Sequence, residues 1–93
     1  MSVHTTLVRI TGRVQGVWYR AWTAEQAQAR GLSGWVRNRA DGSVEALFHG
    51  PAATVADMIA ACHEGPPAAQ VVDVTAESVN EAPPQGFQKR PTL

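Results

Sequence analysis

The chain has 93 residues, 44% of them hydrophobic, which is enough for one small core and leaves little room for a second domain. Eight Lys and Arg balance eight Asp and Glu, whereas nucleic-acid binders usually carry a basic excess for phosphate contacts. One cysteine excludes an intrachain disulfide, and nothing resembles a signal peptide or the roughly 18 apolar residues of a membrane span, so we predict a single domain over residues 1–93, cytoplasmic and without membrane contact.

The first strand and the first helix are predicted on either side of a short loop. Residues 5–13 are rich in β-branched side chains, which are typical of a strand. After a loop over residues 14–19, residues 20–30 predict a helix that stops at the following glycine. Small side chains on its inner face, Ala24 and Ala27, would let this helix lie close to a sheet.

The next two strands are predicted to form a hairpin. They cover residues 33–39 and 43–49, and the Asp-Gly pair at 41–42 readily accepts the positive φ of a tight turn. The second of these strands alternates between apolar and other residues, so its apolar side chains share one face. These side chains are Val44, Ala46 and Phe48.

The second half of the chain predicts one helix and one long strand. Gly50-Pro51 opens the helix, and the glycine and prolines at 65–67 end it. Residues 70–79 predict the last long strand, and the proline-rich tail forms at most a short edge strand. Apolar side chains recur at helical spacing along one face of the helix: Val55, Met58, Ile59 and Cys62.

The order β-α-β-β-α-β predicts an α+β, ferredoxin-like fold, in which two helices cover one face of a mainly antiparallel sheet and the other face meets solvent. In this fold the first two strands run parallel with another strand between them, so both end at the same edge of the sheet. The topology therefore brings Arg20 and Asn38 into one region although they lie far apart in sequence.

The segment GRVQGVWYR, residues 12–20, predicts an unusual corner between the first strand and the first helix. Gly16 permits a backbone in which successive N–H groups face one anion, and the helix dipole and Arg20 would add positive charge there. An anion would also replace the missing side-chain cap. The residues alone leave the plainer interpretation open, in which Gly16 forms a turn, Arg20 is solvated and Asn38 belongs to the hairpin.

Other reactive or aromatic side chains are interpreted as structural. We expect a buried, inert thiol at Cys62, core packing for Trp35, and a contribution of Trp18 and Tyr19 to the wall of the anion site. The three histidines have no ligand spacing, so no metal site is expected at His4, His49 or His63.

Two segments resemble the signatures of the acylphosphatase family. Residues 12–20 are similar to the pattern G-R-V-Q-G-V-x-[FY]-R, and residues 34–50 to the pattern G-W-V-x-N-x-x-D-G-x-V-x-A, ending in glycine. Their order and separation also agree, and only the tail, FQKRPTL, is loosely matched. The resemblance implies a small stand-alone enzyme that hydrolyses acyl phosphates to carboxylate and inorganic phosphate.

The resemblance also implies the roles of the site residues. Arg20 and Asn38 are the expected catalytic residues, with Arg20 binding the phosphoryl group and Asn38 orienting the attacking water. The expected partner is a small-molecule acyl phosphate, without cofactor or metal, and the protein is expected to be a monomer. The phosphate would be cradled by the backbone of Gln15, Gly16, Val17, Trp18, Tyr19 and Arg20.

Two alternatives stand beside this hypothesis. The first is a non-catalytic anion-binding or interaction module, since ferredoxin-like sheets also bind RNA, although the first strand here has no aromatic residue for base stacking and the third has only Phe48. The second is a domain of a larger protein that handles carbamoyl phosphate, which the start at Met1 and the compact end at Leu93 make less favoured. Release of phosphate from benzoyl phosphate would separate a catalyst from a binding module.

Overall fold

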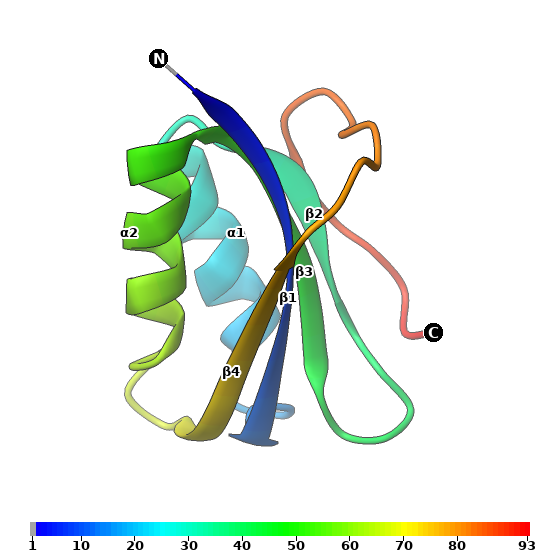
Figure 1. Cartoon of the computed structure of the whole chain (residues 1–93). Coiled ribbons are helices and arrows are strands. Elements are labelled where there is room, and N and C mark those ends of the chain that lie inside the picture. The colour runs from blue at the N-terminus through cyan, green and yellow to red at the C-terminus, as the bar shows by residue number, and fades with distance from the viewer. Residues whose placement is uncertain (1) are drawn as a thin grey trace.

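The computed structural model describes residues 2–93 and has two layers, a five-stranded sheet and two helices on one of its faces (Figure 1). The predicted β-α-β-β-α-β order and ferredoxin-like arrangement are confirmed, and the ends of the predicted elements agree within two residues. The elements are β1 (Val3–Arg13), α1 (Tyr19–Ala29), β2 (Ser33–Asn38), β3 (Val44–Pro51), α2 (Ala52–Cys62), β4 (Gln70–Ser78) and β5 (Phe87–Lys89).

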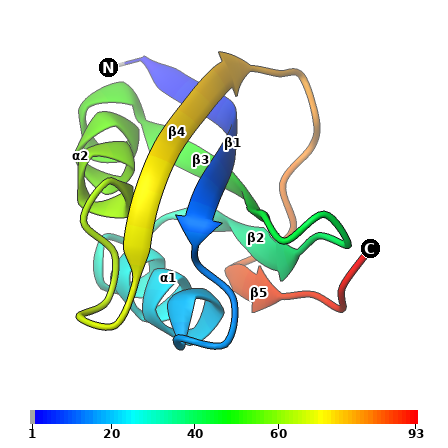
Figure 2. The same ribbon diagram turned by 90° about the horizontal axis from the view of Figure 1, so that it is seen from below.

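The order of the strands in the sheet is β4-β1-β3-β2-β5. Strand β3 pairs antiparallel with both β1 and β2, so β1 and β2 run parallel on either side of it, as predicted. Their last residues, Arg13 and Asn38, therefore lie at the same end of the sheet. Figure 2 looks onto this end, where the loop after β1 turns into α1.

The hydrophobic core lies between the sheet and the helices. Alternate residues of the central strands point toward the helices because side chains alternate across a strand. Both helices have 11 residues, and no helix in residues 2–93 is long and apolar enough to cross a membrane. The predicted inner faces are confirmed by the burial of Val44, Ala46 and Phe48 in β3, Ala24 and Ala27 in α1, and Val55, Met58 and Cys62 in α2.

The other face of the sheet is only partly open to solvent, which corrects the sequence-based expectation. Two large side chains on this face, Trp35 and Leu47, are 2% and 0% exposed. The connection between β4 and β5 passes along this side, and its Glu81 Oε2 accepts a hydrogen bond of 3.0 Å from Trp35 Nε1. A hydrophobic patch on one half of the sheet is thereby covered without a third layer of helices.

Trp35 is buried, but it is not part of the core beneath the helices as we expected. Strand alternation directs its neighbour Val36 into that core, so Trp35 must point to the opposite face. There the guanidinium groups of Arg37 and Arg90 lie 4.6 and 5.1 Å from the centroid of the Trp35 ring. Cation–π contacts and the hydrogen bond at Nε1 thus help to cover the indole on this face.

The C-terminal segment continues along the edge of the sheet beyond the three residues of β5. The strand pairs in parallel with β2, which agrees with the expected short edge strand. Beyond it, Arg90 N donates to Val36 O at 2.8 Å and Leu93 N donates to Asn38 O at 3.2 Å. The segment therefore reaches the end of β2 and lies beside the corner that the sequence singled out.

Candidate active site

The loop between β1 and α1 has an alternating backbone. Gly16 has φ of +73° and Trp18 has φ of +68°, while Val17 between them does not have a positive φ. Left-handed conformations cost a non-glycine residue roughly 1–2 kcal/mol, so Trp18 is held in an unfavourable state. Such alternation turns successive N–H groups toward one side, as in anion-binding nests.

The N–H groups of this loop have no main-chain partners among residues 2–93. Across residues 2–93, the first main-chain bond of α1 runs from Trp22 N to Trp18 O, and residues 15–21 donate none. No side chain caps the helix, as the sequence predicted. A row of unbonded donors therefore lies at the positive end of the α1 dipole.

Arg20 and Asn38 line the same cleft and are both half-buried. Neither side chain makes a hydrogen bond or an ion pair with the described residues 2–93, whereas Arg9, Arg30 and Arg37 each pair with a carboxylate. A half-buried guanidinium and carboxamide without protein partners are free to bind a ligand in the cleft.

The cleft has a volume of about 610 Å³ and a positive lining. Three of its residues are cations, Arg20, Lys89 and Arg90, and none is a carboxylate. Sequence reasoning missed Lys89 and Arg90, because their only signal was a basic pair in a tail of unclear path. The lining residues are Val14, Gln15, Gly16, Trp18, Tyr19, Arg20, Ala21, Asn38, Lys89, Arg90 and Pro91.

The aromatic residues of the loop differ in their surroundings. Trp18 is 81% exposed at the cleft, whereas Tyr19 is buried and donates a hydrogen bond of 2.6 Å from its hydroxyl to Cys62 O. Both line the cleft, as expected, but the side chain of Val17 is buried in the core and can contribute only its backbone. The Tyr19–Cys62 bond anchors the start of α1 to the end of α2.

Burial makes Cys62 a poor nucleophile. Its side chain is fully buried, and desolvation raises the pKa of the thiol to about 12. Burial likewise raises the pKa of the Tyr19 hydroxyl above its usual value. The predicted burial of the thiol is confirmed.

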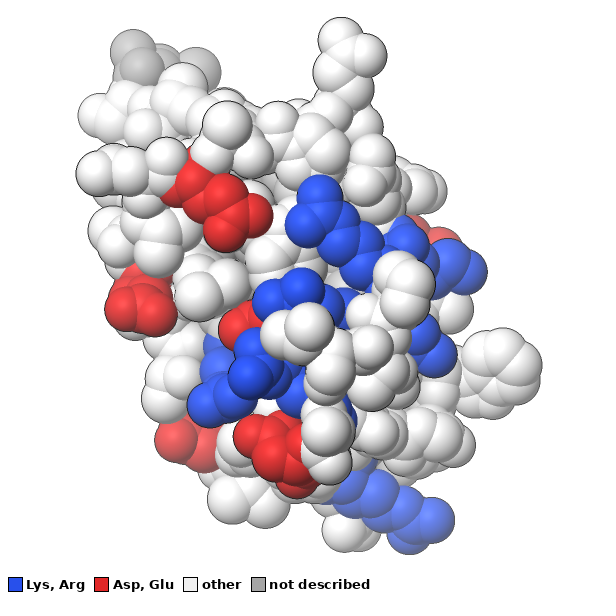
Figure 3. Space-filling view, turned by 90° about the vertical axis from the view of Figure 1, so that its right-hand side faces the viewer, with Lys and Arg blue, Asp and Glu red and all other residues white. Residues whose placement is uncertain are grey.

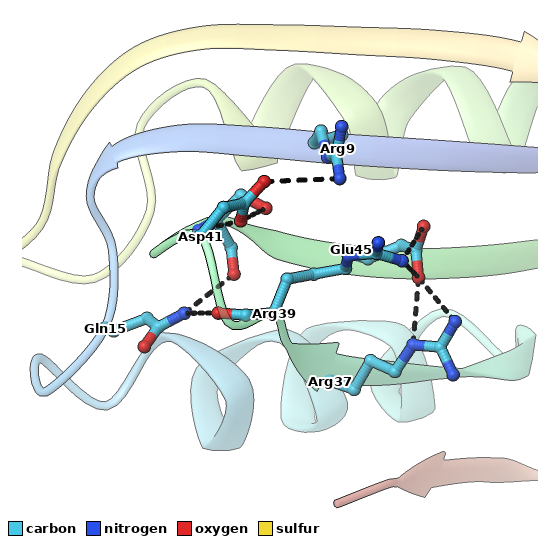
Figure 4. Close-up of polar contacts among 7 residues, drawn as sticks. Arg9, Gln15, Arg37, Arg39, Asp41 and Glu45 are labelled. Atoms are coloured by element: carbon cyan, nitrogen blue, oxygen red, sulfur yellow. Dashed lines mark hydrogen bonds and ion pairs between the residues drawn. The ribbon is translucent and has the colours of Figure 1, made fainter. Parts of the chain in front are cut away.

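Gln15 directs its side-chain amide toward the β2–β3 hairpin (Figure 4). Its Nε2 lies 2.8 Å from Arg39 O and 2.8 Å from Ser43 O. Gln15 thus touches the cleft and also joins the loop after β1 to the loop after β2.

Paired charges occupy the sheet face that points away from the helices. Figure 3 shows Lys and Arg gathered near its middle with carboxylates around them. Glu45, which is 8% exposed, accepts from Arg37 at 2.7 Å and from Arg39 at 3.2 Å. Asp41 lies 3.4 Å from Arg9, and hydrogen bonds from Ser43 hold the pKa of Asp41 below its usual range.

Among residues 2–93, no three His, Cys, Asp or Glu side chains form a group that could hold a metal.

Comparison with known proteins identifies the family. The model of the family described as Acylphosphatase matches residues 6–89. The chain belongs to the acylphosphatase family. It is 58% identical to an acylphosphatase of Rhodospirillum rubrum, over 96% of this chain and 98% of that protein.

Solved acylphosphatase structures have the same fold. An acylphosphatase from Coxiella burnetii superposes with a TM-score of 0.91 at 31% identity, covering 95% of this chain and 93% of that one. An acylphosphatase from Bacillus subtilis gives 0.87 at 30% identity, covering 96% and 99%. The family resemblance noted in the two sequence segments is therefore confirmed over nearly the whole chain.

Proposed function

We propose that this acylphosphatase hydrolyses the carboxyl–phosphate bond of acyl phosphates in the cleft between the β1–α1 loop and the end of β2. The observation that carries the proposal is the joint exposure of unpaired groups: the N–H groups of residues 15–21, the Arg20 guanidinium and the Asn38 carboxamide. The charge of the cleft supports it, because no carboxylate lines the cleft to repel an anionic phosphoryl group.

In this proposal the loop binds the phosphoryl oxygens. Main-chain N–H groups and the dipole of α1 offer positive charge that needs no rearrangement on binding. Arg20, in the first turn of α1, offers a planar pair of donors that matches two oxygens of a phosphoryl group. Lys89 adds positive charge at the rim and favours approach of the anion.

Asn38 is the proposed acceptor for the attacking water. Its Oδ1 accepts a hydrogen bond from the water and holds the water oxygen in line with the bond that breaks, which phosphoryl transfer requires. The position of Asn38 at the end of β2, on the same sheet edge as the loop, supports this role. Its lack of a partner within residues 2–93 leaves the carboxamide free for water.

The chemistry needs little further help. The water oxygen forms a bond to phosphorus, the bond from phosphorus to the acyl oxygen breaks, and the carboxylate leaves with the electron pair. A carboxylic acid has a pKa of about 4, so this group departs as an anion without a general acid. No histidine or carboxylate lines the cleft, so the proton of the water passes to a phosphoryl oxygen or to solvent.

We also infer that the protein is a monomer of the cytoplasm. Its lone cysteine is buried, which suits a compartment where thiols stay reduced. Its large exposed hydrophobic side chains lie on different segments of the chain: Val3, Trp18, Val72 and Leu93.

The direct test is hydrolysis of benzoyl phosphate, with and without a chelator. We expect release of inorganic phosphate at the same rate in both cases, because the proposed positive charges belong to the chain itself. Competitive inhibition by inorganic phosphate should accompany it. Phosphate binding without turnover would instead indicate a non-catalytic anion-binding module and overturn the proposal.

A further inference from the structure

Gln15 links the two halves of the site through one side chain. We propose that Gln15 is a positioning residue, whose amide group holds the β2–β3 hairpin against the β1–α1 loop and thereby sets where Asn38 lies relative to a bound phosphoryl group. The inference rests on the function proposed above. It gives the Gln15 side chain a role separate from phosphate binding by the neighbouring backbone.

The orientation of the Gln15 amide is fixed by its partners. Both groups at 2.8 Å from its nitrogen are main-chain carbonyls, those of Arg39 and Ser43. Carbonyls only accept hydrogen bonds, so the nitrogen rather than the oxygen must face them, and both N–H donors are used. The side chain therefore has no donor left for phosphate.

The hairpin is already closed by its own hydrogen bonds. Arg39 N donates to Ser43 O at 2.8 Å, and Gly42 N donates to Arg39 O at 3.1 Å. Asp41 Oδ1 accepts from both the N–H and the hydroxyl of Ser43, at 2.9 and 2.6 Å. Gln15 thus occupies the second acceptor site of two carbonyls that already have one partner each, so it connects two formed units rather than forming either.

The residues joined by these two hydrogen bonds are next in sequence to the phosphate-binding loop on one side and to Asn38 on the other. Gln15 directly precedes Gly16 of the loop, and Arg39 directly follows Asn38. In the proposed function, phosphate binding depends on the loop and Arg20, whereas in-line attack also depends on the position of Asn38 relative to them. Misplacement by about 1 Å can cost about 100-fold in rate, so loss of this link should affect turnover much more than phosphate affinity.

The test replaces Gln15 by methionine, which has similar length and no donor. For Gln15→Met we expect kcat to fall about tenfold or more, while the inhibition constant of inorganic phosphate changes less than about threefold. Activity is measured well below the melting temperature of each variant, so a loss of stability alone leaves kcat unchanged. The matched control is Gln28→Met, which removes a 3.5 Å bond from another glutamine to Phe87 O and should preserve both constants.

A double-mutant cycle with Asn38→Ala identifies the group through which Gln15 acts. Gln15→Met should lower kcat in the native background and have little further effect once Asn38 is alanine. If Asn38→Ala lowers kcat but Gln15→Met does not, or if the two effects multiply, the positioning role is wrong while the proposed function stands. If Asn38→Ala leaves kcat unchanged, the proposed function fails at its water-positioning step, and the inference falls with it.

A second variant keeps the test decisive if the methionine variant does not fold. Gln15→Leu has an uncharged side chain without a donor for the two carbonyls, so it removes both hydrogen bonds and adds no charge to the cleft. The same kcat and phosphate measurements apply to it. If neither variant folds, the two hydrogen bonds serve the stability of the fold, and the positioning role is overturned.

Discussion

Arg20 and Asn38 reach one cleft from different elements and have different chemical abilities. The guanidinium of Arg20 carries a permanent charge and several donors, whereas the carboxamide of Asn38 is neutral and offers an acceptor oxygen. Neither group is occupied by a partner in residues 2–93. The two side chains should therefore respond to mutation in separable ways, one in affinity and the other in turnover.

Replacement of Arg20 by lysine tests whether shape as well as charge matters. Arg20→Lys keeps the positive charge but loses the two-pronged donor geometry, so we expect kcat/KM for benzoyl phosphate to fall about 100-fold or more. Inhibition by inorganic phosphate should weaken in parallel. A lysine variant with native kcat/KM would show that a single positive charge is sufficient for activity and that the paired donors of the guanidinium are not required.

Replacement of Asn38 by alanine tests the division of roles. Asn38→Ala should lower kcat about 100-fold and leave the inhibition constant of phosphate nearly unchanged, because the loop and Arg20 remain. Steady-state kinetics with phosphate as inhibitor measure both quantities. Loss of phosphate binding with retained turnover is the outcome that contradicts the assignment.

At the residue scale, the sequence indicated a site but not all of its parts. Gly16 and Arg20 stood out because the expected cap was missing and one glycine interrupted the loop. The link made by the Gln15 side chain could not be predicted, since its partners are main-chain carbonyls that any sequence would provide. Lys89 was missed because its place beside the cleft depends on the pairing of β5 with β2.

At the scale of elements, the β1–α1 loop combines a turn, a helix start and a row of free donors. Its shape depends on left-handed conformations at Gly16 and Trp18. A Cβ atom added at Gly16 would meet no other atom within 4 Å, so substitution there changes backbone preference without a clash. This property allows the conformation of the loop to be tested by one methyl group.

Gly16→Ala should destabilise the loop by about 1–2 kcal/mol, because φ of +73° disfavours a side chain. Gly31→Ala is the matched control, since Gly31 has φ of +70° and is equally open but lies at the other end of α1. Denaturant titration should show similar losses for both variants. Only Gly16→Ala should also weaken inhibition by inorganic phosphate. If both variants weakened this inhibition equally, the conformation of the loop would not determine phosphate binding.

Periodicity predicted the elements more reliably than the face on which each side chain lies. In β3, the alternation of Val44, Ala46 and Phe48 identified the core face correctly. In β2, Trp35 was expected in that core, yet its neighbour Val36 takes the inward position. The cover over Trp35 comes from the distant residue Glu81 and from two arginines, contacts that no local pattern encodes.

At the scale of the whole molecule, charge is balanced overall but unevenly distributed. The formal net charge is zero, yet the cleft is lined by three cations and no carboxylate. Elsewhere, arginines such as Arg37 are neutralised by carboxylates such as Glu45. A neutral protein can therefore present a cleft lined by cations and no carboxylate, as expected when function depends on a small site rather than on a global field.

Stability should decline in alkaline solution because two buried acidic groups stay protonated in the folded state. The pKa of Cys62 rises from 9.0 to about 12, so above pH 9 the unfolded chain releases a proton that the folded chain retains. The free energy of unfolding should then fall by about 1.4 kcal/mol per pH unit, with Tyr19 adding its own slope above pH 10. Below pH 9 neither group should contribute a slope.

Denaturant titrations of the native chain and of Cys62→Ala between pH 8 and about 10 measure this decline. The alanine variant should be less stable at every pH but should lose little further stability between pH 9 and 10, where the thiol dominates. Parallel declines in the two proteins would exclude Cys62 as the source.

The alternating backbone between β1 and α1 also has a consequence for mutational surveys. Every amino acid except proline brings the same amide hydrogen, so exchanging a side chain in this loop does not delete the donor beside it. An alanine scan would register Arg20 and pass over most neighbours whose contribution is main-chain. Exchange of single amide bonds for esters, which erases one donor at a time and leaves each side chain in place, is the perturbation to which such a site is sensitive.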